Sequence, residues 1–186
     1  MKPLLHALLL AGFAAAASAG TIRNPSFEEP ADTNRADCAQ AADWETSGTW
    51  WRRETGWQPR HWGPCMMAYH HWRVTEPAPS GFHQDVSGIP PNTSVRFSIF
   101  VSSDADANFQ TLEIRIEPQG GGAPLAAQVL TTKSLKDTDW RQVSVAAITP
   151  SSGAIRVAVL VSPAAGHPHR GAIRFDDASL DIGGNR

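Results

Sequence analysis

The sequence predicts an all-β fold, a single antiparallel β-sandwich, and three observations support this prediction. Apolar and polar residues alternate in several short runs, which is the period of half-buried strands. Clusters rich in Gly, Pro, Asn and Ser punctuate these runs as turn signals. Helical periodicity of useful length is absent after residue 19, which argues against parallel strands joined by helices.

The first 19 residues predict an export signal of bacterial type and are excluded from the fold. Lys2 precedes an apolar run over residues 4–17, and the Ala-Ser-Ala tripeptide at 17–19 fits the small-residue rule for signal cleavage. The apolar run is shorter than the roughly 20 residues that a membrane span requires. We therefore expect residues 20–186 to form one secreted or periplasmic domain, which is large enough to bury a core.

Residues 34–79 differ from the rest of the mature chain. They contain six of the seven Trp residues, both Cys residues, the single Tyr and three His residues, yet no long alternating run. A stretch of this length without strong secondary structure in a compact domain is usually a binding or active-site region. We expect it to combine short strands with binding loops.

Four alternating runs in the C-terminal half define the clearest strands. Their apolar faces comprise Val95, Phe97, Ile99 and Val101; Leu112, Ile114 and Ile116; Val143, Val145 and Ala147; and Ile155, Val157, Val159 and Val161. Turn signals lie at residues 87–92, 118–124, 149–153 and 162–171. Each run therefore predicts a strand with one buried face.

The charge of the chain is nearly balanced, with a formal net charge of −2 and both signs interspersed. This distribution lacks the basic footprint of a nucleic-acid-binding protein and the polybasic patch of a membrane-surface protein. We therefore expect a neutral or small partner, no nucleic acid and no membrane span. Composition leaves the oligomeric state open.

Cys38 and Cys65 are the only cysteines. Because exported proteins meet an oxidising compartment, we expect them to form one disulfide. Such a bridge would stabilise the fold by roughly 3–4 kcal/mol in the chain-entropy model. A two-Cys metal site is the alternative, although the close C-x-x-C pairing of such sites is missing.

Five segments of the mature chain carry a family resemblance. They are "TIRNPSFEEP" at 21–30, Trp44, "GFHQDVSGIPPNTSVRFSIFVSS" at 81–103, "DTDWRQVSVAAI" at 137–148 and "AIRFDDASLDI" at 172–182. In this order they resemble the jelly-roll carbohydrate-binding modules of the galactose-binding-like superfamily, in which an N-x-x-F-E strand opens the domain and an F-D-D-x-x-L strand closes it. The resemblance implies a jelly-roll sandwich with Trp44 and Trp140 in its core. The 45–80 region departs from the family in length and Trp content.

The resemblance also implies a structural Ca²⁺ where the first and last strands meet. Carried over by position, Glu28 and Asp176 are the expected ligands, followed by Asp177 and Glu29. A hard dication accepts carboxylate oxygens and would offset their desolvation, which would explain two adjacent Asp residues inside an apolar strand. Alternatively, one Asp faces solvent at a bulge and the other caps a turn.

The aromatic region has the chemistry of a sugar site, because sugar C–H faces stack on aromatic rings while hydroxyls need polar partners. Adjacent Trp50 and Trp51 on a strand would point to opposite faces, so at most one can join the core. The residues expected to contact a glycan are Trp50, Trp51, Arg53, Trp57, Gln58, Arg60, His61, Trp62, Tyr69, His70 and Trp72.

Two enzyme hypotheses remain open beside the sugar hypothesis. Tyr69, His70 and His71, together with Arg53 and Glu54, could supply the acid, base and charge neutraliser of a polysaccharide lyase. For glycoside hydrolysis, nothing ranks the candidate carboxylates Glu45, Glu54 and Glu76. No nucleophile elbow, zinc-protease motif or phosphate-binding loop is present.

Two further alternatives concern binding. His167 and His169, with His70 or His71, could hold a transition metal. The Trp-rich face could also contact another extracellular protein instead of a sugar. Taken together, the sequence favours a secreted, non-catalytic carbohydrate-binding domain with a structural calcium ion.

Overall fold

The computed structural model describes residues 20–29, 41–48, 51–55, 61–70, 78–135, 139–164 and 170–183. This part of the chain contains ten β-strands and one short 3-10 helix, Thr132–Ser134. No helix within these ranges is long and apolar enough to cross a membrane. The predicted export signal lies outside the described residues.

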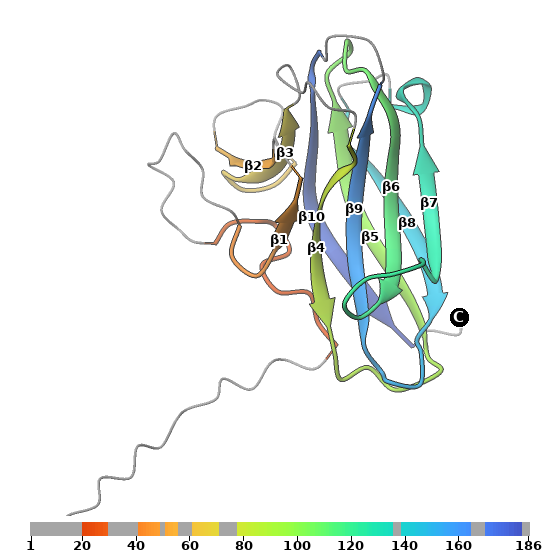
Figure 1. Ribbon diagram of the computed structural model, residues 1–186. Helices are drawn as coiled ribbons and strands as arrows, with labels where there is room; N and C mark the ends of the chain where they lie inside the picture. Colours follow the sequence, from red (N-terminus) through yellow and green to blue (C-terminus); the bar gives the residue numbers. More distant parts are fainter. Residues whose placement is uncertain are drawn as a thin grey trace, which may run out of the picture.

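The strands form two five-stranded antiparallel sheets that pack face to face (Figure 1). Sheet A has the order β1-β4-β9-β6-β7, with the bounds Glu45–Ser47, Ser80–Val86, Ile155–Pro163, Phe109–Pro118 and Ala126–Leu130. Sheet B has the order β2-β3-β10-β5-β8, with the bounds Trp51–Glu54, Met66–His70, Ala172–Ile182, Ser94–Ser103 and Arg141–Ile148. The predicted antiparallel jelly-roll sandwich is therefore confirmed.

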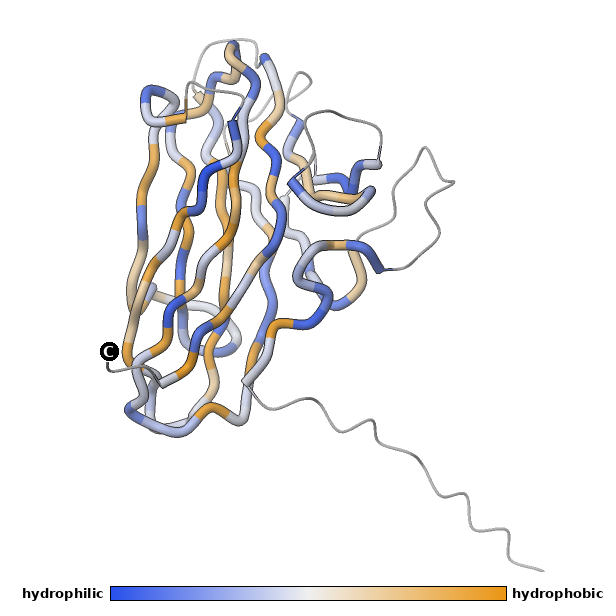
Figure 2. The backbone as a smooth tube through the Cα atoms, turned by 180° about the vertical axis from the view of Figure 1, so that it is seen from behind, coloured by the Kyte–Doolittle hydropathy of each residue, from blue (hydrophilic) through white to orange (hydrophobic). Residues whose placement is uncertain are grey.

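Strand periodicity places the core between the two sheets. All of the apolar residues predicted to face inward in the four C-terminal runs belong to the core or pack against it, with Ala147 at its margin. Hydrophobic and hydrophilic residues alternate along the long strands (Figure 2). Because side chains of a strand alternate between its faces, the polar residues of these strands lie on the outer faces of the sheets.

An aromatic cluster joins the N-terminal segment to both sheets. Phe82 of β4 lies at its centre, with ring centroids 5.7 Å from Phe27, 5.4 Å from Trp44, 4.9 Å from Trp51 and 5.4 Å from Phe175. All four contacts have the edge-to-face geometry that aromatic pairs prefer. The predicted core position of Trp44 is confirmed, since it is buried in this cluster.

Asn24 shapes the N-terminal N-x-x-F-E motif. Its side-chain amide donates to the carbonyls of Glu29 and Ala42, and its side-chain oxygen accepts the Glu29 N–H. The Asn24 carbonyl accepts the Phe27 N–H at 3.2 Å and the indole N–H of Trp44 at 3.0 Å. Phe27 has φ = 57° in this loop, and its ring is fully buried. The motif therefore directs Phe27 into the core and leaves Glu28 beside the edge of sheet B.

We expect Phe82→Ala to lower the free energy of unfolding by about 3–5 kcal/mol, because truncation of a buried Phe loses burial and leaves a cavity among four rings. Urea denaturation measures this change. Val129→Ala on the exposed face of β7 is the control and should stay within about 0.5 kcal/mol of the parent protein. Equal effects of the two substitutions would contradict the central position of Phe82.

Candidate functional site

A β-bulge in β10 accounts for the paired carboxylates of the last strand. The register between β10 and β5 shifts between Asp176 and Ser179, and Asp177 adopts φ = 47°, in the left-handed region. Adjacent residues of a regular strand would point to opposite faces, whereas a bulge re-aims one of them. Asp176 is fully buried and Asp177 half-buried, and both carboxylates contact the same segment, residues 61–65.

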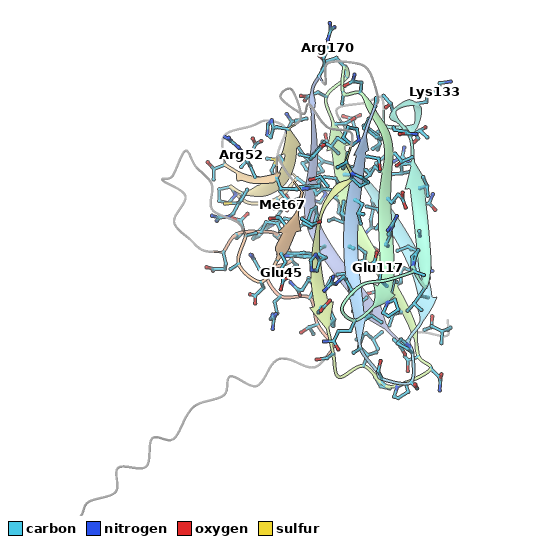
Figure 3. The ribbon with its side chains drawn as sticks, in the orientation of Figure 1. Glu45, Arg52, Met67, Glu117, Lys133 and Arg170 are labelled. Atoms are coloured by element: carbon cyan, nitrogen blue, oxygen red, sulfur yellow. The ribbon has the colours of Figure 1, made fainter. Side chains whose placement is uncertain are left out.

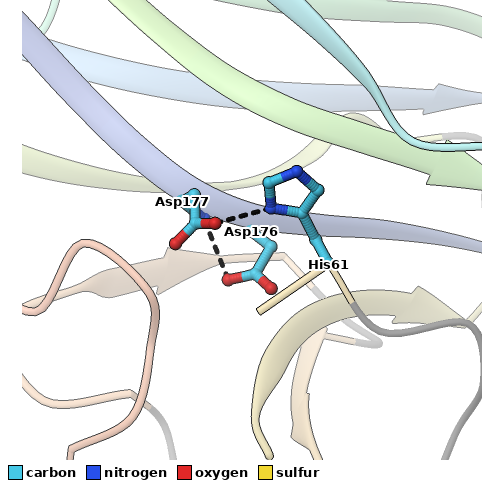
Figure 4. A group of neighbouring side chains, drawn as sticks. All are labelled: His61, Asp176 and Asp177. Atoms are coloured by element: carbon cyan, nitrogen blue, oxygen red, sulfur yellow. Dashed lines mark hydrogen bonds and ion pairs between the residues drawn. The ribbon is translucent and has the colours of Figure 1, made fainter. Parts of the chain in front are cut away.

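The 61–65 segment surrounds the two Asp side chains with donors. The Trp62 N–H donates to Asp176 Oδ2 at 3.1 Å, and the Asp177 N–H donates to Asp176 Oδ1 at 2.8 Å. His61 Nδ1 lies 2.5 Å from Asp177 Oδ2, as Figure 4 shows. The Ser26 hydroxyl donates to Asp177 Oδ1 at 2.5 Å. Each Asp oxygen therefore has a partner.

Glu28 contacts the same segment from the N-terminal side. Its Oε1 accepts the Cys65 N–H at 3.1 Å. A Cβ at Gly63 would lie only 2.0 Å from Glu28 Oε1 and would displace that carboxylate, and the φ of +63° favours glycine as well. Arg53 holds the backbone behind the carboxylate by donating from Nε to the Phe27 carbonyl and from Nη2 to the Glu28 carbonyl, each at 2.6 Å. We call Glu28, His61, Asp176 and Asp177 the carboxylate cluster.

Burial dominates the electrostatics of the carboxylate cluster. Desolvation raises the pKa of Asp176 to about 7, partly offset by the Trp62 N–H, and the negative charges of Asp177 and Glu28 raise it further. The charge on Asp176 is therefore unfavourable in the folded protein when only these groups surround it. A bound cation would remove this cost.

The cluster has the donor atoms of a cation site. One ligand atom from each of His61, Asp176 and Asp177 lies within 4.8 Å of the others. The structure thus brings both predicted Asp ligands together, and Glu28 reaches the same loop. Glu29 instead is exposed and binds Asn24 through its backbone. The sequence did not identify His61 as a cluster member, because its proximity to Asp177 arises only from the folded loop.

Aromatic side chains lie next to the cluster on the outer face of sheet B. Phe100 of β5 points outward because its neighbours Ile99 and Val101 are in the core, and it pairs with Asp176 across the strands. The His61 ring stacks on Phe100 with a centroid distance of 3.8 Å, and it lies 5.6 Å from Trp140. Trp62 is 61% exposed. We call His61, Trp62, Phe100 and Trp140 the aromatic surface.

The prediction that Trp140 packs in the core is wrong. Trp140 is half-buried, lies outside the core cluster and contacts the His61 ring. It precedes β8 in phase with Gln142 and Ser144, whereas Val143 and Val145 of that strand are the core residues. Trp140 therefore belongs to the outer face of sheet B.

The predicted ligand contacts of Trp51, Arg53 and Tyr69 do not fit their positions. Trp51 and Tyr69 pair across β2 and β3 on the inner face, and the Trp51 ring packs on Tyr69, Phe82 and Phe175. The Trp51 indole N–H donates to Ser80 Oγ at 2.9 Å. Tyr69 and Arg53 are buried, and burial raises the pKa of Tyr69 to about 12. These three side chains therefore contribute to the packing of the protein interior.

Other predicted residues lie outside the described ranges. They are Cys38, Trp50, Trp57, Gln58, Arg60, His71, Trp72, Glu76, His167 and His169. Of the predicted disulfide, only Cys65 is described; it is buried, and Arg53 Nη2 donates to its Sγ at 3.0 Å. The pairing of Cys38 with Cys65 stays a prediction.

The predicted lyase constellation is divided between the two faces of sheet B. His70 and Glu54 are both buried, and His70 Nε2 contacts Glu54 Oε1 on the outer face. Tyr69 and Arg53 point into the core, because they neighbour His70 and Glu54 along their strands. In the described part of the chain these four side chains therefore do not converge on one reacting centre.

A hollow of about 170 Å³ lies on the outer face of sheet A. Gly81 and Ala158 form part of its floor, and its polar walls include His83, Glu117 and Arg156. Glu45 and Glu117, labelled in Figure 3, both belong to strands of this sheet. The charged groups are paired: Arg156 donates to both oxygens of Asp85 at 2.7 and 3.1 Å, which holds the pKa of Asp85 below its usual value. His83 pairs with Glu45 at 3.2 Å, and Arg115 with Glu117 at 3.4 Å.

Comparison with known proteins gives matches by structure alone, because no family model and no curated protein matches the sequence. The carbohydrate-binding module TmCBM61, solved with β-1,4-galactotriose, superposes with a TM-score of 0.59 at 16% identity. The match covers 88% of this chain and 99% of the module. The C-terminal family 22 carbohydrate-binding module of Clostridium thermocellum Xyn10B gives a TM-score of 0.54 at 13% identity, covering 91% of this chain and 99% of the module.

Proteins of other activity share the same architecture. The apo form of a cyclase from Fischerella sp. superposes with a TM-score of 0.61 at 17% identity, covering 87% of this chain and 94% of the cyclase. At such identities the likeness concerns the fold. The chain thus has the β-sandwich fold found in carbohydrate-binding modules of families 61 and 22 and in a cyclase.

Proposed function

We propose that this protein is a carbohydrate-binding domain and that its ligand lies on the aromatic surface. The observation that carries this proposal is the position of Trp62, which is 61% exposed while its backbone N–H donates to buried Asp176. A large apolar ring held on a fixed backbone loses little conformational entropy when a partner covers it. The family 61 module solved with galactotriose supports the choice of a sugar as the partner.

Polar groups next to the rings suit the hydroxyls of a sugar. Gln142 pairs with Phe100 across β5 and β8 and is exposed. The side-chain amide of Gln142 donates hydrogen bonds through its nitrogen and accepts them through its oxygen. A sugar could therefore stack on Trp62 while Gln142 binds its hydroxyls, which is the usual combination of apolar and polar contacts in a ligand site.

We further propose that the carboxylate cluster holds a structural Ca²⁺ through oxygens of Glu28, Asp176 and Asp177. Calcium takes six to eight oxygen ligands, including carboxylates. The raised pKa of buried Asp176 supports a cation, because the negative charges of Asp177 and Glu28 lie close enough to raise it further. Bound there, the ion would neutralise charge and tie the N-terminal segment to β10. Export by the signal at residues 1–19 is part of the same proposal.

The first test is affinity electrophoresis of the mature protein through gels that contain soluble β-1,4-galactan, xylan or other polysaccharides, with calcium present. We expect one polysaccharide to retard the protein. Trp62→Ala should weaken that retardation roughly 30-fold, since truncation of a central aromatic contact costs about 2 kcal/mol. Its melting temperature should stay close to that of the parent because the ring is mostly exposed.

Two control variants test where on the protein a sugar binds. Ile148→Ala removes another exposed apolar side chain, which is 58% exposed at the end of β8, and should leave retardation unchanged. Glu117→Gln alters the hollow of sheet A. Loss of retardation in Glu117→Gln with full binding by Trp62→Ala would move the sugar to the hollow. Uniform mobility across the panel would refute the carbohydrate proposal.

The calcium proposal predicts a rise in melting temperature when EDTA is replaced by calcium. At 100 times its dissociation constant a ligand adds about 2.7 kcal/mol of stability, which is about 5–10 °C for a domain of this size. Differential scanning calorimetry measures the shift. Glu28→Gln should reduce it, whereas Asp181→Asn, an exposed position of β10, should leave it intact. Identical melting in EDTA and calcium would contradict the site.

The pKa of Asp176, raised to about 7 from its usual 3.8, predicts how stability varies with pH in EDTA. The folded protein binds this proton more tightly than the unfolded chain, so the free energy of unfolding should fall as the pH rises from 4 to 7 and then level off. Asp176→Asn should remove most of this dependence, and Asp181→Asn should retain it. Urea denaturation across the pH range measures the effect, and a rise over that range would contradict the assignment.

A further inference from the structure

His61 belongs to both candidate surfaces. Its Nδ1 lies 2.5 Å from Asp177 Oδ2, inside the carboxylate cluster. The same imidazole ring stacks on Phe100 at 3.8 Å with an interplanar angle of 24° and approaches Trp140 at 62°. A rigid ring cannot change one of these relations without changing the other. His61 therefore joins the two surfaces mechanically.

The residues after His61 strengthen this connection. Trp62 donates its N–H to Asp176, Gly63 lies against Glu28, and Cys65 donates its N–H to Glu28. The backbone that presents the exposed indole is thus fixed by the carboxylates that would ligate the proposed cation. Phe100, in contrast, is held by strand pairing on both sides and forms a firm base for the His61 ring.

We propose that His61 is a positioning residue through which cation occupancy of the carboxylate cluster controls ligand binding on the aromatic surface. The inference rests on the proposed carbohydrate and calcium sites and assigns a coupling between them. Its physical basis is that the cation and the 61–65 segment share the same carboxylate oxygens. A cation that changes how Asp176 and Asp177 are held also changes what holds the His61 and Trp62 rings.

Coupling between two sites is reciprocal and is measured as a ratio of affinities. We expect the polysaccharide that retards the protein in the gels to bind about fivefold or more tightly in calcium than in EDTA. This ratio lies within the usual range for coupled sites. Isothermal titration calorimetry gives both dissociation constants. Titration of Tb³⁺ with excitation of the Trp residues reports occupancy of the cluster without any sugar.

Two substitutions distinguish the contact of the His61 imidazole with Asp177 from its stacking on Phe100. His61→Phe keeps a ring over Phe100 but loses the nitrogen that contacts Asp177, so the calcium-to-EDTA affinity ratio should fall toward one. His61→Asn keeps a short donor toward Asp177 but loses the ring, so Tb³⁺ binding should persist while sugar affinity falls in both conditions. Val129→Phe adds an exposed ring on β7, far along sheet A, and should alter neither measurement.

The outcomes separate this inference from the proposed function. If the sugar binds equally in calcium and EDTA, the coupling is refuted and the carbohydrate proposal stands. If no polysaccharide binds, the carbohydrate proposal fails, and near-UV circular dichroism then decides the coupling. A calcium-induced change in aromatic signal that His61→Phe abolishes supports it; an unchanged signal, or absence of any cation binding, refutes it.

Discussion

A fully buried carboxylate, Asp176 of the central strand β10, constrains the structure on the outer face of sheet B. Its two oxygens need donors inside the protein, and the backbone N–H groups of Trp62 and Asp177 supply them. Supplying them requires a bulge in β10 and a loop that crosses the outer face of sheet B. The same requirement anchors the backbone of Trp62, from which an exposed side chain extends.

The N-terminal segment and the last strand depend on each other at the bulge of β10. Ala178, just after the bulge, donates its N–H to the Pro25 carbonyl at 2.9 Å, and Ser26 donates to Asp177. Phe27 meanwhile packs in the aromatic cluster, and Arg53 binds the carbonyls beside Glu28 from within the core. The N-terminal segment therefore takes part both in packing the rings and in assembling the carboxylates.

Period-2 patterns predicted the fold and the central strands, because alternation alone decides which face of a long strand is buried. The same rule predicts that Trp50 and Trp51 point apart, but it cannot say which one enters the core; strand pairing with Tyr69 placed Trp51 inside. The family resemblance predicted Trp140 in the core. Its alternation with the β8 residues that follow it places it on the outer face instead. His61 was missed as a cluster member because it meets Asp177 across 116 residues of chain, and no local pattern links two residues so far apart.

The free-energy cost of covering the surface differs between the hollow of sheet A and the aromatic surface of sheet B, and this difference affects where a ligand binds. In the hollow of sheet A, His83, Glu117 and Arg156 are already engaged in ion pairs, so a sugar would have to replace those interactions with its own hydrogen bonds. On the aromatic surface the exposed Trp62 indole gains free energy from any apolar cover, at about 25 cal/mol per Å² of buried area. Because covering an exposed ring breaks no existing pair, the aromatic surface is the more favourable place for a neutral ligand.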